Sequence, residues 1–361
     1  MRGPYLGVTA PLPLNAWTRR AAGTLPYPLD GATRLHARAR AGLYQAIRQL
    51  GLGKGDVALL PAYHHGSEVE AYVRAGLTPR FYDTGPGILP EPAELTDLLT
   101  PDVRVIHMIH YLGLAQPATA WRALADRHGS LLVEDVAQGW LGSDEGRPLG
   151  SIGDVALFSV YKSVGVPDGG VAVLHGRVVT PVGRAPIDIG ALSRRHVAFL
   201  ASRSALFGSS PARRRKRAYD SARDFDLGDP DRAAGRATIA LIRRLAGPHV
   251  AQTRRQHYRR LLAELGPWVP PPYALDPGDS SPFAFPIGSD SKEALVTALR
   301  EAGIGAVDAW SVPHPALPVD SFPGAGRWRA RIALIPVHQE LRDADIDRLV
   351  RATRSILAAG S

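Results

Sequence analysis

Short apolar runs alternate with helical stretches between about residues 36 and 176, which predicts βα units around a largely parallel sheet. The expected strands span residues 57–63, 79–83, 103–110, 131–137, 155–161 and 170–175. Apolar positions about 3.6 residues apart predict helices over 41–50, 67–75 and 119–128. Each of these helices lies beside a glycine that can end it: Gly51, Gly76 and Gly129.

Residues 177–235 have a different character, because they are rich in Arg, Gly, Pro and Ser, and we expect loops with short helices there. Helical periodicity returns over 237–245 and 250–265 and is followed by a compact α+β tail. We therefore expect a large domain over residues 1–235 and a smaller C-terminal α+β domain over residues 236–361.

The composition is that of a globular protein, with 361 residues of which 45% are hydrophobic. No apolar run approaches the roughly 18 residues that cross a bilayer, and residues 1–20 lack a compact apolar leader, so we expect a soluble, cytoplasmic protein without membrane contact. The absence of cysteine excludes disulfides, thiolate metal ligands and a cysteine nucleophile.

The net charge of +9 comes almost wholly from arginine, because only four of the 43 basic residues are lysines: Lys54, Lys162, Lys216 and Lys292. Arginine is not usefully deprotonated, so chemistry that needs a neutral amine has only these four positions. The basic run at 213–217 is suited to nucleic acid, but no zinc-finger or RNP-type motif accompanies it. We interpret it as a solvated loop and do not expect a nucleic-acid partner.

Two neighbouring predicted strands end in residues that can do chemistry. One ends in Glu134 and Asp135, at the edge where open α/β sheets bind ligands, although Asp135 alone is equally typical of a loop cap or an ion pair. The next delivers Lys162 after an apolar run, where a buried cation is costly, so the lysine either reaches water or acts as a neutral amine. Such a pair meets the needs of pyridoxal phosphate (PLP): the lysine forms a Schiff base, and the acid keeps the pyridine nitrogen protonated.

Other chemistries are disfavoured by the same sequence. His107 and His110 lie three positions apart on a strand and so face opposite sides of the sheet, and we expect no metal site. The Gly66-Ser67-Glu68 turn lacks the second glycine of a hydrolase nucleophile elbow, and no strand-to-helix Gly-x-Gly-x-x-Gly turn indicates a dinucleotide.

Taken in order, these motifs resemble the DegT/DnrJ/StrS family of sugar aminotransferases. The matching residues are Glu134-Asp135-Val136-Ala137-Gln138, Gly153-Asp154, Phe158-Ser159, Lys162 and Gly169-Gly170. Further likeness lies at 53–63, 75–83 and 334–349, so that it covers roughly residues 36–176 and 300–358.

The resemblance implies PLP fold type I, with a large, mostly parallel-sheet cofactor domain and a smaller α+β C-terminal domain. It implies a PLP-dependent aminotransferase that moves an amino group from an amino-acid donor, glutamate, to a keto sugar linked to a nucleotide. A PLP-fold protein that has lost transamination and serves in binding or regulation stays open as the alternative. The sequence names neither the acceptor nor the carbon that is aminated.

Roles carried over from the family fall on four residues of this chain. Lys162 would hold the cofactor, Asp135 would bond its pyridine nitrogen, and Gln138 would lie near the ring hydroxyl. Ser159 would bind the phosphate. Only Val160 and Tyr161 separate Ser159 from Lys162, where the family commonly has about two more residues, so the approach of the lysine must be rebuilt locally.

Two further positions depart from the family. Residues 39–41 replace the family's phosphate-binding Gly-Thr-Ala turn, and backbone N–H groups at a helix start can still bind phosphate. Arg40 and Ala41 are the expected phosphate contacts. A solvent-exposed Arg40 without a phosphate contact stays open as the alternative. In the family an aromatic side chain often covers the cofactor ring, but Val69 occupies that position here. We therefore expect His64 or His65 to stack on the ring, and His65 is our choice.

The resemblance also implies a homodimer with shared active sites. The arginine-rich residues 177–235 are expected to complete the partner's site, with a surface loop of no catalytic role as the alternative.

Overall fold

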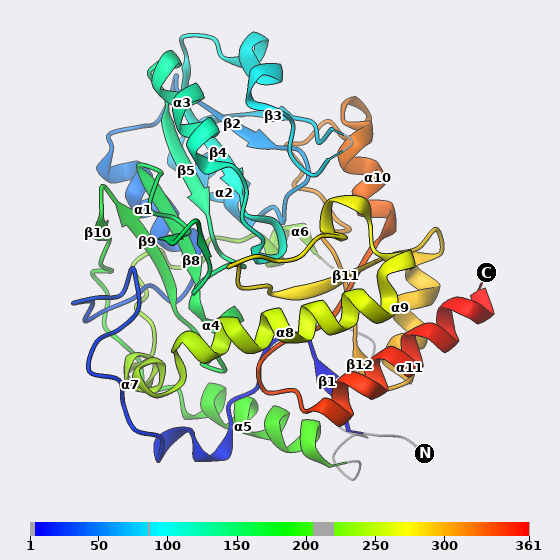
Figure 1. Cartoon of the computed structure of the whole chain (residues 1–361). Coiled ribbons are helices and arrows are strands. Elements are labelled where there is room, and N and C mark those ends of the chain that lie inside the picture. The colour runs from blue at the N-terminus through cyan, green and yellow to red at the C-terminus, as the bar shows by residue number, and fades with distance from the viewer. Residues whose placement is uncertain (1–3, 86, 205–219, 361) are drawn as a thin grey trace.

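A computed structural model describes residues 4–85, 87–204 and 220–360, and its largest sheet has seven strands (Figure 1). The strand order is β10-β9-β8-β5-β4-β2-β3, in which β8, β5, β4, β2 and β3 are parallel and β9 and β10 are antiparallel to their neighbours. The largely parallel sheet is thus confirmed. The strands are β2 Val57–Pro61, β3 Thr78–Tyr82, β4 Val103–Ile109, β5 Leu131–Asp135, β8 Val155–Ser159, β9 Gly170–Leu174 and β10 Arg177–Val178.

Helices α1 (Ala39–Gln49), α2 (Ser67–Ala75) and α3 (Ala118–His128) begin and end within two residues of the predicted helices. The glycines at their ends adopt the left-handed conformation that lets a helix stop: φ is 97° at Gly76 and 65° at Gly129. Helix α1 packs on β8 and β9, whereas α3 packs on β4 and β5. Both faces of the sheet are therefore covered, which is why its strands are almost continuous apolar runs.

The start of α1 lies unusually close to β9, because glycine leaves the space open. A Cβ added to Gly170 would lie 2.0 Å from the carbonyl carbon of Arg38, and one added to Gly42 would lie 2.9 Å from the Cβ of Ala172. The neighbours of Gly170 are backbone atoms that cannot give way cheaply. The two glycines thus fix the N-terminus of α1 beside the ends of β8 and β9.

Residues 177–235 differ from the prediction of loops with short helices. Helix α5 (Ile189–Arg203) is 15 residues long, and the side chain of Asp188 caps it by accepting the N–H of Ala191 at 2.7 Å. Arginine, leucine and alanine recur in this segment and have high helix propensity, which the prediction overlooked. Helix α6 (Ser221–Asp224) is short, and the basic run at 213–217 lies outside the described residues.

The C-terminal part is an α+β arrangement on a three-stranded antiparallel sheet of order β11-β14-β13. Strand β1 (Leu6–Gly7), near the start of the chain, pairs in parallel with β12 (Ile304–Gly305) in this part. The domain limits at 235 and 236 stay a prediction. The other elements here are α7 Arg236–Leu245, α8 Pro248–Leu265, β11 Ala284–Gly288, α9 Lys292–Glu301, β13 Val307–Asp308, α10 Pro323–Arg331, β14 Ile332–Pro336 and α11 Asp343–Gly360.

Shorter elements complete the chain, and among them the one-turn helix α4 matters most for the site. They are α4 Val160–Ser163, the hairpin β6 Ser143–Asp144 with β7 Arg147–Pro148, and 3-10 turns at Leu14–Trp17, Pro92–Leu98, Tyr111–Gly113, Gly266–Trp268, Pro271–Tyr273 and Val319–Ser321. None of the helices in the described part of the chain is long and apolar enough to cross a membrane.

Candidate active site

A pocket lies where the carboxyl ends of β5 and β8 meet the N-terminus of α1. Most of the residues predicted for the site line it together: Arg40, His65, Asp135, Gln138, Ser159 and Lys162. A larger cavity of about 610 Å³ lies in the C-terminal part, between Trp268 and Trp328. No lysine lines this cavity, and its acid Asp290 pairs with Arg331 at 3.1 Å, so we place the candidate active site in the sheet-edge pocket.

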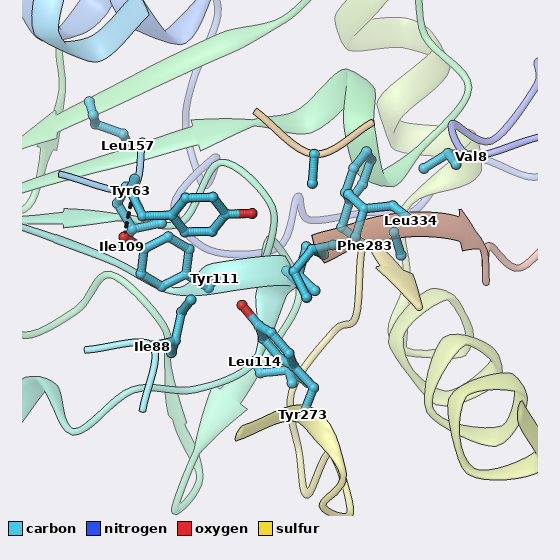
Figure 2. Close-up of a cluster of buried hydrophobic side chains, with 14 of the residues drawn as sticks. Val8, Tyr63, Ile88, Ile109, Tyr111, Leu114, Leu157, Tyr273, Phe283 and Leu334 are labelled. Carbon is cyan, nitrogen blue, oxygen red and sulfur yellow. Dashed lines mark hydrogen bonds between the residues drawn. The ribbon is translucent and has the colours of Figure 1, made fainter. Parts of the chain in front are cut away.

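Lys162 reaches the pocket because the chain turns into α4 directly after β8. Ser159 is the N-cap of this single turn, and the two residues between Ser159 and Lys162 are taken up by the turn. Within the described residues the amine makes no hydrogen bond or ion pair, and Nζ lies 5.9 Å from the centre of the Phe283 ring. Figure 2 shows Phe283 in the cluster of buried apolar side chains. The shortened spacing therefore still brings the amine to the pocket.

Asp135 ends the neighbouring strand and is 9% exposed. Its Oδ1 accepts the N–H of Ala137 at 2.7 Å, and its Oδ2 lies 3.6 Å from Nε2 of His107, an ion-pair rather than a hydrogen-bond distance. Burial acts to raise the pKa of Asp135, but His107, the Ala137 N–H and the charge of Lys162 together hold it below the usual value. Asp135 is therefore a carboxylate at neutral pH, as a partner of a pyridinium must be.

The support behind Asp135 is a buried pair. His107 is fully buried, and its Nδ1 lies 3.0 Å from the hydroxyl of Tyr72 on α2. The chain of contacts Tyr72–His107–Asp135 fixes the orientation of the imidazole, as groups behind a functional side chain commonly do.

Glu134 points to the other face of the sheet and has a structural task. Its carboxylate accepts the N–H groups of Gly150, Ile152 and Gly153, and Oε2 lies 3.1 Å from Nε2 of His110. Burial acts to raise the pKa of Glu134, but His110 and the backbone donors outweigh it and lower the pKa. His107 on β4 and His110 directly after it thus contact different carboxylates, and no group of three or more His, Asp or Glu suited to a metal occurs in the described residues.

The end of the pocket at α1 is electropositive. The N-terminus of α1 has no side-chain cap and no acidic residue in its first turn, so backbone N–H groups face this end of the pocket. Arg38 lies over the ring of Tyr161, 4.9 Å from its centre, and Arg40 donates to the carbonyl of Asp224 at 2.8 Å. Ala41 does not line the pocket, and its N–H donates to the Arg38 carbonyl at 3.2 Å.

The two histidines after β2 are separated by the structure. His64 is buried away from the pocket, with Nδ1 2.9 Å from the Pro61 carbonyl, whereas His65 lines the pocket. Burial, followed by the positive charges of Lys162 and Arg40, lowers the pKa of His65 to about 3. The imidazole of His65 is therefore neutral, and a neutral ring can stack on another ring without placing a second cation beside Lys162.

Gln138 is oriented by the backbone of a neighbouring turn. Its Oε1 accepts the N–H of Leu112 at 2.9 Å, in a turn where φ of Leu112 is 56°. The amide oxygen is thereby used, which leaves the amide nitrogen as the donor on the pocket side.

Several lining residues were missed by sequence reasoning, among them Arg38, Glu68, Tyr161 and Trp310. Trp310 comes from the C-terminal part, and its ring lies 4.9 Å from that of Tyr63 and 5.5 Å from that of Tyr111. Figure 2 shows the last two rings side by side, joined by the bond from the Tyr111 hydroxyl to the Tyr63 carbonyl. The left-handed backbone of Trp310, with φ 48°, gives no sequence signal, whereas Tyr161 adjoins the lysine and could have been proposed.

These residues fit pyridoxal phosphate by their donor set. The arginines and the N–H groups at the start of α1 suit an anionic phosphate, Asp135 suits a protonated ring nitrogen, and Lys162 offers an amine that makes no hydrogen bond or ion pair in the described chain. The three groups lie in one pocket.

Comparisons with known proteins match part of the chain to aminotransferases. Residues 37–178 match the DegT/DnrJ/EryC1/StrS aminotransferase family, which confirms the resemblance carried by the motifs. The L-glutamine:2-deoxy-scyllo-inosose aminotransferase of Streptoalloteichus tenebrarius is 32% identical over 142 residues, which are 38% of this chain and 34% of that protein. The match spans about a third of the length of this curated relative.

Solved structures support the fold over nearly the whole chain. The Streptococcus pneumoniae protein Spr1654 in its PLP form has a TM-score of 0.69 at 16% identity, with 98% of this chain and 99% of that one covered. The aminotransferase TlmJ of Streptoalloteichus hindustanus has a TM-score of 0.65 at 21% identity, with 91% and 86% covered. The expected PLP fold type I architecture is thus confirmed.

Glu134 generates a test of the loop that it anchors. Because its pKa is lower in the folded than in the unfolded chain, its contribution to stability is complete above the unfolded pKa of about 4.3 and is lost as the pH falls through the folded pKa. Glu134→Gln should lower the free energy of unfolding by about 1–3 kcal/mol at pH 7.5, and by less at pH 3.5. Urea unfolding at both pH values measures this.

The exposed Glu293, on α9, provides the control. Glu293→Gln should change the free energy of unfolding by less than about 0.5 kcal/mol at either pH. A deficit of Glu134→Gln that is equally large at both pH values would contradict the assigned role of the charge.

Proposed function

We propose that this chain, whose residues 37–178 match the DegT/DnrJ/EryC1/StrS aminotransferase family, is a pyridoxal-phosphate-dependent aminotransferase. The observation that carries the proposal is the presence of Lys162 and Asp135 in one pocket, on adjacent strand ends, beside an electropositive helix N-terminus. The 32% identity to a named aminotransferase over 142 residues supports it.

The residues would divide the work as follows. When bound, the cofactor supplies an acceptor for the electrons left on the donor's α-carbon. Lys162 would hold it covalently and then, as a free amine, move a proton at that carbon. Asp135 would keep a proton on the ring nitrogen, and Gln138 would donate its amide N–H to the ring hydroxyl.

The phosphate and the ring face have their own holders. The N–H groups at the start of α1, with Arg40 and Ser159, would bind the phosphate, and Arg38 would add charge. His65 would stack on the ring as a neutral imidazole. Trp310 would cover the mouth of the pocket and limit the entry of water.

The substrates that we propose are an amino-acid donor and a cyclic keto acceptor. Glutamate is the donor expected from the family resemblance, and the relative named for L-glutamine makes that amino acid the second donor to test. The acceptor is the keto group of a sugar linked to a nucleotide, and the net charge of +9 supports an anionic acceptor. Conversion of bound cofactor to its pyridoxamine form by either donor distinguishes an enzyme from a binding or regulatory protein.

Lys162→Ala tests the covalent link. The variant should lose the borohydride-reducible absorbance of bound pyridoxal phosphate and the exchange of amino groups with donor, because no other described residue offers an amine in the pocket. Lys54→Ala, at an exposed position, is the control and should behave as wild type. A Lys162→Ala protein that reacts with donor at the wild-type rate would exclude the assignment.

Asp135→Asn tests the ring-nitrogen partner. An amide cannot hold the ring nitrogen protonated, so the variant should bind pyridoxal phosphate but react with donor roughly 100-fold or more slowly. Stopped-flow absorbance measures the rate, with the exposed Asp320→Asn as control. Equal rates in Asp135→Asn and wild type would remove Asp135 from this role.

We propose a homodimer in which residues 177–235 complete the partner's site. Support comes from apolar side chains that are strongly exposed in one chain: Val182 (80%), Ile187 (72%) and Ile189 (70%). Sedimentation should show a dimer, and Ile187→Asp and Ile189→Asp should weaken it. In a separate binding measurement, affinity for the acceptor should fall as the salt concentration rises above about 0.15 M. A fully active monomer would refute the shared site.

A further inference from the structure

Arg254, on α8, is a buried arginine whose contacts converge on the lysine turn. It is 1% exposed, and within the described residues no carboxylate pairs with it. Instead its Nη2 donates to the carbonyl of Ser163 at 2.8 Å and to that of Lys162 at 3.3 Å. Burial lowers the pKa of this guanidinium to about 9. Glu340 acts on Arg254 only through its charge and forms no ion pair with it. A buried cation held mainly by neutral carbonyls is costly, so its burial points to a specific task.

The lysine turn needs such a donor. Helix α4 has a single turn, and the last carbonyls of a helix lack partners within the helix. The carbonyls of Lys162 and Ser163 are two of these, and a cation at a helix C-terminus is favourable. Gln339 adds a second donor, because its Nε2 lies 3.1 Å from the Ser163 carbonyl while its Oε1 accepts from Nε of Arg254 at 3.0 Å.

The other half of the guanidinium fixes the surface against which the amine lies. Nη1 of Arg254 donates to the carbonyl of Pro282 at 2.9 Å and approaches that of Phe283 at 3.4 Å. The ring of Phe283 lies 5.9 Å from Nζ of Lys162. One planar group therefore fixes both the backbone that carries the amine and the ring beside it.

We propose that Arg254 is a positioning residue that, with Gln339, sets the direction from which the amine of Lys162 would reach the cofactor aldehyde, where a C=N bond would replace the C=O bond and the oxygen would leave as water. The inference rests on the proposed function, and it assigns Arg254 a role through Lys162 rather than contact with substrate. Arginine is needed because its rigid fork reaches carbonyls on two segments at once, which the single ammonium of lysine cannot do.

The test measures capture of pyridoxal phosphate by the apoprotein, which requires no transamination. Stopped-flow absorbance gives the rate of capture, and borohydride reduction with peptide mass analysis identifies the lysine. Arg254→Met should slow capture by Lys162 roughly 10- to 100-fold, as expected for a misplaced reacting group. Arg254→Lys should recover part of the capture rate, and Gln339→Leu should slow capture several-fold.

Arg259→Met is the matched control, because Arg259 lies on the same helix but is exposed and pairs with Asp276 at 2.7 Å. It should capture at the wild-type rate. Thermal unfolding separates folding from positioning: a folded Arg254→Met with a lower Tm and unchanged capture would overturn the proposal. If Arg254→Met does not fold, Gln339→Leu and Arg254→Lys decide, and unchanged capture in both would overturn it.

The same measurement separates this inference from the proposed function. If the wild-type protein captures pyridoxal phosphate on Lys162 and the Arg254 and Gln339 variants capture it equally fast, only the positioning inference is refuted. A wild-type protein that captures no pyridoxal phosphate on Lys162 refutes both.

Discussion

Much of the site depends on the alternation of side chains along β5, where two consecutive carboxylates are sent to opposite faces of one strand. Glu134 receives three backbone N–H groups from residues 150–153 and so holds the loop that leads into β8. Asp135 enters the pocket beside Lys162, which follows β8. Glu134, on one face, thus helps to position β8, and β8 leads to Lys162, which lies beside Asp135 on the other face. A shift of one residue in register would exchange the tasks of the two acids.

The electrostatics of the pocket follow from the same arrangement. Burial is the main cause that lowers the pKa of His65, and the positive charges of Lys162 and Arg40 add to it. Burial acts the other way on Asp135, whose pKa stays below its usual value because His107, the Ala137 N–H and Lys162 favour the carboxylate. The neutral ring and the charged carboxylate therefore follow from burial together with the neighbouring groups. Such a pocket favours a ligand that carries negative charge at the end near α1 and an aromatic ring beside Asp135.

The sequence predicted the sheet well because its strands are buried on both faces and so read as apolar runs, and it predicted three helices because glycines end them. It also selected Lys162 and Asp135, since both follow buried strands. It missed α5, whose exposed apolar residues blur the helical period, and it placed Ala41 at the phosphate end.

The residues that the sequence could not supply are those brought in from far along the chain. Trp310 and Arg254 lie on elements of the C-terminal part, and only the packing of that part against the sheet brings them to the lysine turn. No spacing or local pattern marks either residue. An arginine on a helix is ordinarily solvent-exposed, so its burial could not be foreseen.

The pairing of β1 with β12 bears on how the chain is made. Leu6 is almost fully buried, and its register partner is Ile304, so this part of the first ten residues reaches its final position only after nearly 300 more residues have been joined. At ribosomal rates that delay is on the order of tens of seconds. Throughout it the leading segment is apolar and unpaired, while the parallel sheet between the two partners has time to assemble. A segment that is synthesised before the large sheet is therefore locked in place after it.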